Sequence, residues 1–438
     1  MEFLSSGLKP VLPISSAKMS PVKTRLPAWV WILVALGFCF ALGSGLQMQR
    51  NQHGVDDFDQ FYVGARLVFS GHLYDLPAQL ELQRETVGVE RPAVSSSRLP
   101  FYYAMLWPLG RLQYATARTL WFGLMILAAV GFVLVYPMGG RVPLRDRRGS
   151  VSGFDGGRWV LAAAVLSSLP LFAATLGQRQ DIALLLLILG VSLRLRALGY
   201  ETAAGLVLAL LAIKIHLFLL VPVALLMRRE WRMTFGLAGG GVALLGFSFA
   251  AAGRGWVREY LALISNPGVI SDPAGKPNLH GVVAAWSHAG AWEAVLSIAV
   301  VVAVVVVAGR SGFEIAFSAG MLGSFLVSNH AYLHDCAVLI PGLVEIAGRK
   351  SRRQPARPLK ITRVEDPEPT ASFGRGSWSG SEDIGRGAAW GLAVTLLTPF
   401  PYFLPPLLIH IREGVGPAVL IGATLLALIP TVKGENKA

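Results

Sequence analysis

Long blocks of apolar residues, separated by short polar stretches, set the pattern of this chain. Clear examples are Trp29–Leu46, Leu120–Tyr136, Asp181–Leu193, Phe235–Ala252 and Val295–Ala308. Several of them reach the roughly 17–25 residues that a helix needs to span a bilayer. The pattern therefore predicts an all-α integral membrane protein that crosses the bilayer roughly a dozen times.

The composition supports this interpretation. The chain has 438 residues, of which 53% are hydrophobic and only 15% are charged, whereas a soluble protein carries about 25% charged residues. A larger soluble core would not explain the deficit, because a water-facing surface still needs charge. The net charge of +13 could suggest a nucleic-acid partner. The basic residues gather in a few short loops, however, which is the pattern of membrane topology, and we expect no nucleic acid to bind.

The basic residues also predict which loops face the cytoplasm, because short cytoplasmic loops carry an excess of lysine and arginine. They gather in 1–27, 141–158, 194–196, 228–232 and 349–386, which we therefore assign to the cytoplasm. The loops that remain would lie on the extracytoplasmic side: 49–118, 176–180, 252–290, 328–334 and 408–414. This orientation predicts a multi-pass plasma-membrane protein with both termini in the cytoplasm.

The same pattern divides the chain into four parts. Residues 1–27 form a cytoplasmic tail before an uncleaved first helix, because the first apolar run is too long for a typical signal peptide. Residues 28–348 form the transmembrane core. Residues 349–386 are rich in Pro, Ser and Gly and predict a flexible basic linker, and 387–432 form a final pair of transmembrane helices. The two cysteines offer neither a metal-ligand spacing nor a disulfide framework.

Residues 201–227 form one apolar run with basic clusters beyond both of its ends. A single crossing would place one of these clusters outside, whereas a hairpin of two short helices keeps both inside. The turn would then lie near Ile213–His216, and Lys214 would lie at the outer surface. At the bilayer centre its charge would cost about 2.5–3.5 kcal/mol on insertion scales. We therefore predict a hairpin here and about twelve transmembrane helices in all.

The first external loop places aspartates among aromatic side chains. Asp56, Asp57 and Asp59 follow the first apolar block, and Tyr62 and Tyr102 come later in the loop. An aspartate can deprotonate an attacking hydroxyl, so this composition suits chemistry on sugars. In an extended loop Asp57 and Asp59 would point the same way and Asp56 the other. The competing interpretation is a solvated acidic loop, because charged side chains are mostly exposed.

Several short motifs follow one another in a defined order. They are Asp57–Tyr62 (DFDQFY), Gly71–Asp75 (GHLYD), Pro100–Ala104 (PFYYA), Pro108–Leu109, Gly177–Gln180 (GQRQ), Ala212–Ile215 (AIKI), Arg228–Arg232 (RREWR) and Ser328–Asp335. In these motifs, over residues 30–345, the chain resembles glycosyltransferase family 87, a polyprenol-phosphate-mannose-dependent branch of the GT-C membrane glycosyltransferases. The family has proline where this chain has Ala104, Ile215 and Asn329.

The resemblance implies a GT-C-like bundle of about 12 transmembrane helices with an extracytoplasmic first loop. It implies transfer of a hexose, with mannose the expected sugar, from a polyprenyl-phosphate donor to a glycolipid or glycan acceptor. The transfer would invert the anomeric carbon and need no cofactor. Asp57 matches the motif position of the general base, with Asp59 as the fallback. His334 matches the family's late histidine, which would orient Asp57 or contact the donor phosphate.

The residues expected to bind donor or substrate come from the outer loops: Lys214, Gln178, Arg179, Gln180, Tyr62, His216 and Tyr102. Lys214 would hold the lipid phosphate as a point charge, and the alternative is a snorkelling lysine that anchors a short helix. The turn at 178–180 would hydrogen-bond sugar or phosphate, or serve only as a polar turn. His330 and His334 would share one helix face, but no third ligand lies beside them, so we expect no metal.

Three other functions compete with a glycosyltransferase. A transporter or lipid flippase would call for internal repeats and charges deep within several helices, and we find no repeat. A lipid-linked oligosaccharide ligase would also act outside, but on a pyrophosphate-linked donor, against which the resemblance speaks. A non-catalytic partner in envelope assembly stays open from the sequence. The identity of the sugar, the acceptor and the linkage, and the oligomeric state, are likewise open.

Overall fold

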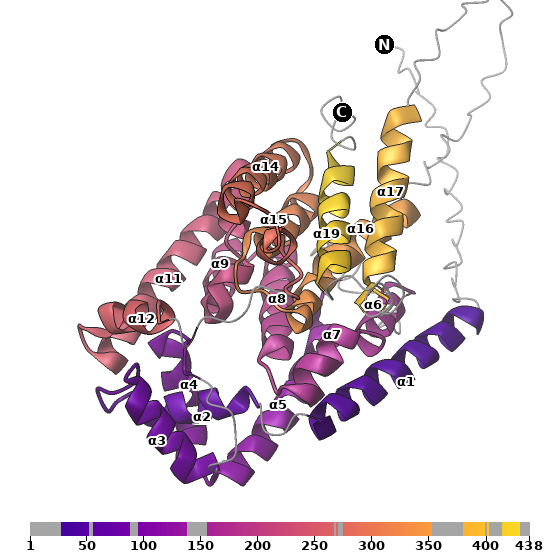
Figure 1. Cartoon of the computed structure of the whole chain (residues 1–438). Coiled ribbons are helices and arrows are strands. Elements are labelled where there is room, and N and C mark those ends of the chain that lie inside the picture. Colours follow the sequence, from indigo (N-terminus) through magenta and orange to yellow (C-terminus); the bar gives the residue numbers. More distant parts are fainter. Residues whose placement is uncertain are drawn as a thin grey trace, which may run out of the picture.

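A computed structural model describes residues 28–51, 56–87, 95–137, 156–266, 269, 275–352, 380–398, 401–402 and 414–429 (Figure 1). Every regular element within these residues is a helix, so the predicted all-α class is confirmed for them. The N-terminal tail 1–27, most of the basic linker and the greater part of the loops at 141–158 and 408–414 lie outside the described residues.

The helices can be divided into two groups by their length and composition. The long or apolar elements are α1 (Ala28–Asn51), α5 (Tyr114–Val135), α6 (Gly156–Leu166), α7 (Leu169–Phe172), η1 (Ala173–Gly177), α8 (Ile182–Ala197), α9 (Glu201–Leu208), η2 (Ala209–Leu217), α10 (Val221–Met227), α11 (Trp231–Ala252), α14 (Ala289–Arg310), α15 (Phe313–Val327), η3 (Leu333–Leu339), α16 (Ile340–Arg352), α17 (Gly380–Leu396) and α19 (Val415–Leu428). The short connecting helices are α2 (Phe58–Leu67), α3 (Leu76–Val87), α4 (Pro100–Gly110), α12 (Trp256–Ile264) and α13 (Leu279–Val283).

Three helices within the described residues, α5, α11 and α14, are long and apolar enough to cross a bilayer on their own, with 22 residues each. The bent pair 158–166 and 169–177 makes a fourth if it counts as one span. Apolar side chains of these helices point away from the protein; Leu127 and Phe235 are each 69% exposed. Outward-facing apolar surface on this scale indicates contact with lipid. The chain is therefore a membrane protein, and the count of about twelve crossings stays a prediction.

Helices α2, α3 and α4 lie together at one end of the bundle (Figure 1). They pack against α12 through a small apolar cluster that includes Val68, Tyr74, Tyr103 and Trp256. These segments belong to the loops predicted outside the membrane, 49–118 and 252–290. Two long loops that are predicted to lie outside the membrane thus pack together in one group of short helices.

Helices α9 and α11 approach so closely that only glycine fits at their contact. A β-carbon on Gly205 would lie 2.0 Å from the carbonyl oxygen of Met233, and one on Gly236 would lie 2.1 Å from that of Thr202. Small residues at such contacts let helix backbones pack within a membrane, where burial of apolar surface gives little driving force.

The segment 201–227 turns back on itself, as predicted. Its helical course breaks at Lys214, whose backbone is non-helical at φ −130° and ψ 62°. The two ends then meet, because Arg196 before the segment forms an ion pair of 3.0 Å with Glu230 after it. The hairpin is confirmed in its course, and the side of the membrane that its ends face stays a prediction.

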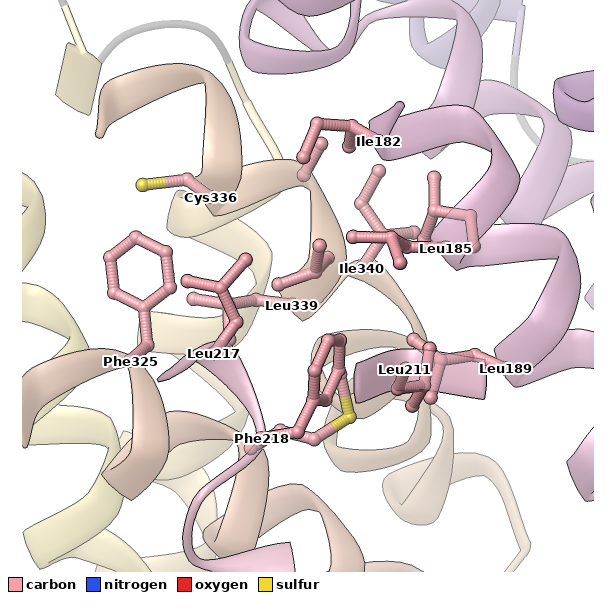
Figure 2. Packing of buried hydrophobic residues seen from close by; sticks show 14 of the residues in the cluster. Ile182, Leu185, Leu189, Leu211, Leu217, Phe218, Phe325, Cys336, Leu339 and Ile340 are labelled. Atoms are coloured by element: carbon pink, nitrogen blue, oxygen red, sulfur yellow. The ribbon is translucent and has the colours of Figure 1, made fainter. Parts of the chain in front are cut away.

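The interior of the bundle lies where α8, η2, α15, η3 and α16 meet (Figure 2). The labelled side chains there are Ile182, Leu185, Leu189, Leu211, Leu217, Phe218, Phe325, Cys336, Leu339 and Ile340. This packing holds η2 and η3 inside the protein. Because η2 carries Lys214 and η3 carries Asp335, the same packing positions two charged side chains in the interior.

Candidate functional site

Segments from several predicted outer loops meet around Asp57, Gln178, Lys214 and Asp335, and we call this part of the bundle the site end. The backbone N–H of Asp57 donates to the carbonyl of Gln178 at 3.0 Å. The ammonium group of Lys214 donates to Asp335 at 2.7 Å. The pair of Arg196 and Glu230 lies on predicted cytoplasmic loops. Each of these contacts thus joins loops that were predicted to lie on the same side of the membrane.

Asp57 precedes the first residue of α2 and is held there by two glutamines. Its Oδ1 accepts a hydrogen bond from Nε2 of Gln60 at 3.1 Å, and its other carboxylate oxygen accepts one from the side-chain amide of Gln180. Removal of the carboxyl from water raises the pKa of Asp57 to about 6, although the charges of Lys214 and Arg98 work against this. A carboxylate with a pKa near neutrality suits a general base.

Asp56 and Asp59 have other partners. Oδ2 of Asp56 lies 2.7 Å from Nε of Arg118 and 2.7 Å from Nη1 of Arg179, and both arginines donate to it. Asp59 is fully buried and accepts a hydrogen bond from the hydroxyl of Tyr114. The expectation that Asp57 and Asp59 point the same way is wrong, because helix α2 begins at Phe58 and the loop is not extended.

A buried series of charged groups leads inward from Asp57. Oε1 of Gln180 accepts from Nη2 of Arg98 at 3.5 Å, and Nε of Arg98 lies 3.5 Å from Oδ2 of Asp181. Oδ1 of Asp181 lies 3.5 Å from Nζ of Lys214, which donates to Asp335. Charges in the protein interior are normally paired in this way. Asp57, the candidate base, is thus linked to Lys214 through the amide of Gln180 and then through the opposite charges of Arg98 and Asp181.

His334 lies at the inner end of this series. Its Nε2 is 3.5 Å from Oδ1 of Asp335, and its ring stacks on Tyr332 with centroids 5.5 Å apart. His216 contacts His330 edge to face at 5.5 Å. Among the described residues, no three His, Cys, Asp or Glu side chains gather closely enough to hold a metal ion.

Not all of the expected binding residues join this cluster. The hydroxyl of Tyr62 donates to the carbonyl of Leu112 at 2.7 Å, which is a structural contact. The guanidinium of Arg179 forms an ion pair with Asp56, and the carbonyl of Arg179 accepts a hydrogen bond from the indole N–H of Trp121 at 2.8 Å. Asp57, Gln178, Gln180, Tyr102, Lys214, His216 and His334 do gather around the charged series. Their roles stay predictions.

Arg98 and Asp181 were not among the expected site residues. Asp181 is the first residue of an apolar block, and Arg98 comes shortly before the motif at Pro100. A charge at the edge of an apolar block is equally typical of a snorkelling anchor. The positions of Arg98 and Asp181 in the sequence therefore did not indicate a functional role. Their place in the cluster is visible only from the distances between the charged groups.

Many polar atoms of this cluster have no hydrogen-bond partner among the described residues. They are the hydroxyl of Tyr102, Oε1 of Gln178 and Nε2 of His216, together with Nε of Arg98, both carboxylate oxygens of Asp181 and Nε2 of His334, which have only ion-pair contacts at 3.5 Å. In native proteins the great majority of buried polar atoms are paired, and each exception calls for an explanation. A polar ligand would supply partners for such atoms, and donors and acceptors of these kinds suit sugar hydroxyls and phosphate.

Comparison with known proteins finds one match. The family model described as glycosyltransferase family 87 matches residues 100–328, just over half of the chain. The matched range contains Gln178, Asp181 and Lys214, while Asp57 and His334 lie outside it. No curated protein and no solved structure matches the chain.

Proposed function

Because the chain belongs to glycosyltransferase family 87 and is a membrane glycosyltransferase, we propose that it uses a polyprenyl-phosphate-linked hexose as donor. Mannose is the expected sugar, and a glycolipid or glycan is the expected acceptor. Transfer takes place on the extracytoplasmic face of the plasma membrane with inversion of the anomeric carbon. The observation that carries the proposal is the partly buried Asp57, held by Gln60 and Gln180 beside the buried charges of Arg98, Asp181 and Lys214.

The proposed reaction is a direct displacement. The acceptor hydroxyl oxygen attacks the anomeric carbon, the bond from that carbon to the phosphate oxygen breaks, and polyprenyl phosphate leaves with the electron pair. The hydroxyl proton passes to the carboxylate of Asp57. A pKa of about 6 for Asp57 supports this role, because the group is mostly deprotonated at neutral pH yet remains a useful base. No covalent intermediate, metal or other cofactor is required.

The donor phosphate needs cations at the site end, and Lys214 and Arg98 are buried there. Lys214 remains the proposed point-charge contact, although Asp181 and Asp335 already surround it. The planar fork of Arg98 is the second cation, and its Nε has no hydrogen-bond partner among the described residues. A phosphate would compete with Asp181 for both groups. We propose that His334, through Asp335, helps to fix Lys214 for this contact.

The proposal is tested with the purified full-length protein in vesicles that contain radiolabelled polyprenyl-phosphate mannose and an extract of membrane glycolipids. We expect an acceptor-dependent labelled product by thin-layer chromatography, with an anomeric configuration opposite to that of the donor. Asp57→Asn is the matched inactive control, and a chelator should leave the rate unchanged. Transfer from a nucleotide sugar but not from the lipid donor would overturn the proposed donor class.

A further inference from the structure

Lys276 is a buried lysine in the loop that leads into α13, and its side chain reaches the turn 328–332 between α15 and η3. The residue is only 4% exposed. Its Nζ donates to the carbonyl oxygen of Asn329 at 3.0 Å and lies 5.6 Å from the ring centroid of Tyr332. A charge-assisted hydrogen bond and a cation–π contact both gain strength where water is excluded. One side chain thus contacts the turn near its start and at its end.

The turn 328–332 leads directly into the part of the candidate site that surrounds Lys214. The ring of Tyr332 stacks on that of His334 with centroids 5.5 Å apart. The backbone N–H of Tyr332 donates to Oδ2 of Asp335 at 2.9 Å, and Oδ1 of the same carboxylate accepts from Lys214 at 2.7 Å. A shift of Tyr332 would therefore move both His334 and the carboxylate that holds Lys214.

The loop that carries Lys276 is itself held from two sides. The buried Asn278 donates from Nδ2 to the carbonyl of Ala331 at 3.3 Å and accepts the backbone N–H of Gly281 at 2.8 Å. A β-carbon on Gly281, or on Gly414 at the start of α19, would collide with the backbone of Lys276. The C-terminal segment thus packs directly on this loop, and the backbone of Lys276 has little room to move.

We propose that Lys276 is a positioning residue. It fixes the turn 328–332, so that His334 and Asp335 hold Lys214 where the donor phosphate binds, and the C-terminal segment supports it through Gly414. The inference rests on the proposed function, and it adds how two later parts of the chain keep the phosphate contact in place. Lys276 acts through the turn and makes no contact with the donor.

The backbone of the turn offers a way to separate these two roles of a cation. Ser328 has φ −69° and ψ 127°, the extended conformation that is favoured before a proline. Asn329 is exposed and its φ is not positive, so a proline fits at this position, the second residue of a turn. Proline restricts the backbone without any lysine. Asn329→Pro should therefore replace a hold on the turn, whereas it cannot replace a contact between an ammonium group and phosphate.

The kinetic test compares Lys276→Met, Asn329→Pro and the double variant in purified full-length protein. We expect Lys276→Met to raise KM for the lipid donor about tenfold, because misplaced groups bind the donor less well. Asn329→Pro alone should behave as wild type, and the double variant should recover most of the lost affinity. A raised KM that proline does not restore would mean direct contact with the donor. An unchanged KM, with or without a lower melting temperature, would leave Lys276 no role in the site. Either result overturns the inference.

A second variant reaches the same loop from the other side and leaves the lysine in place, so it also serves if Lys276→Met does not fold. Gly414→Ala should raise KM for the donor in the same direction, because its β-carbon would displace the backbone of Lys276. Gly422→Ala on α19 is the matched control, since no atom lies within 4 Å of a β-carbon there. A wild-type KM in Gly414→Ala would overturn the part assigned to the C-terminal segment.

A third measurement does not depend on turnover. Hydrogen exchange of the backbone amides in 328–335 is followed by mass spectrometry on protein without donor, with peptides of α5 as the internal reference. We expect faster exchange of 328–335 in Lys276→Met, slowed again by Asn329→Pro, and no change in α5, because exchange reports local opening. Unchanged exchange of 328–335 would overturn the inference. Faster exchange in a protein whose wild type transfers no sugar would instead count against the proposed reaction alone.

Discussion

The ammonium nitrogen of Lys214 lies 2.7 Å from Oδ1 of Asp335 and 3.5 Å from Oδ1 of Asp181. All three side chains are at most 2% exposed. The lysine comes from the break within η2, and the two carboxylates come from the start of α8 and from η3. One cation therefore joins three segments that are distant in the chain, and it has a structural role whether or not it also contacts a donor phosphate.

This arrangement predicts that Lys214→Ala lowers stability as well as donor use. Removing one partner of a buried ion pair leaves an uncompensated charge and typically costs about 3–5 kcal/mol. We expect a lower melting temperature in detergent and, in the folded fraction, a raised KM for the lipid donor. Lys214→Arg should restore only part of the activity, because a planar fork replaces a point charge. Wild-type stability with a raised KM would show that Lys214 acts on the donor alone, and wild-type behaviour in both would remove it from the mechanism.

Asp57→Asn should abolish measurable transfer while the protein still folds and binds lipid donor. The amide is nearly isosteric with the carboxylate and cannot take the acceptor proton, and general-base catalysis typically contributes about 10²–10⁴-fold. Single-turnover rates of purified protein, with thermal unfolding as the control for folding, measure this. Near-normal turnover in Asp57→Asn with loss in Asp59→Asn would move the base to Asp59, and normal turnover in both would exclude the aspartate mechanism.

Asp56→Asn should fail in a different way. Asp56 is not the motif aspartate, but it pairs with both Arg118 and Arg179 at 2.7 Å. An amide cannot neutralise the two guanidinium groups, so we expect a loss of stability measured by thermal unfolding, with turnover reduced because the turn that contacts Asp57 is loosened. Unchanged stability would mean that the two arginines find water or other partners.

The pH dependence of transfer follows from the raised pKa of Asp57. Below about pH 6 the carboxyl is protonated and cannot act as a base, so activity should fall as pH drops through 6. An ordinary aspartate, with a pKa of 3.8, would keep its activity well below that pH. Gln180→Ala removes a hydrogen bond that favours the charged form, so its acid limb should move to higher pH. An unmoved limb would separate the titrating group from Asp57.

The overall arrangement could be predicted from the sequence because lipid imposes strong rules. Apolar length predicted α5, α11 and α14, and the positions of basic residues predicted that the chain turns back near Lys214. The loops that carry Asp57, Gln178 and His334 were expected on one side, and their segments do meet at the site end. These predictions need only hydropathy and charge, which are local properties of the chain.

The details of the site could not be predicted in the same way. Because helix α2 begins at Phe58, the side chains there follow helical geometry and not the two-residue alternation of an extended chain. Asp57 and Asp59 therefore do not point the same way. Arg98 and Asp181 meet across a sequence separation that no spacing rule covers. Pairing of buried charges depends on how the helices pack, so residues at the edges of apolar blocks carry no signal of their partners.

The close contact of α9 and α11 predicts a sharp difference between two glycines on the same helix. Gly236→Ala should destabilise the protein by about 1–3 kcal/mol through overpacking, because its β-carbon would lie 2.1 Å from the carbonyl oxygen of Thr202. Gly239→Ala is the matched control, since no atom lies within 4 Å of a β-carbon there. Thermal unfolding in detergent measures both. Equal melting temperatures would mean that α9 and α11 separate at little cost.

The hairpin predicts that both ends of segment 201–227 are in the cytoplasm. Single cysteines are introduced by Ala197→Cys and Arg232→Cys in a Cys39→Ser background, since Cys39 is exposed and Cys336 is buried. Both should resist an impermeant maleimide on intact cells and react after permeabilisation. A third variant, His72→Cys, is the positive control, because His72 is exposed in the predicted outer loop at the far end of the bundle. Labelling of only one of the first two would place the ends on opposite sides and contradict the ion pair of Arg196 with Glu230. Labelling of both on intact cells would invert the whole orientation and move Asp57 to the cytoplasmic face.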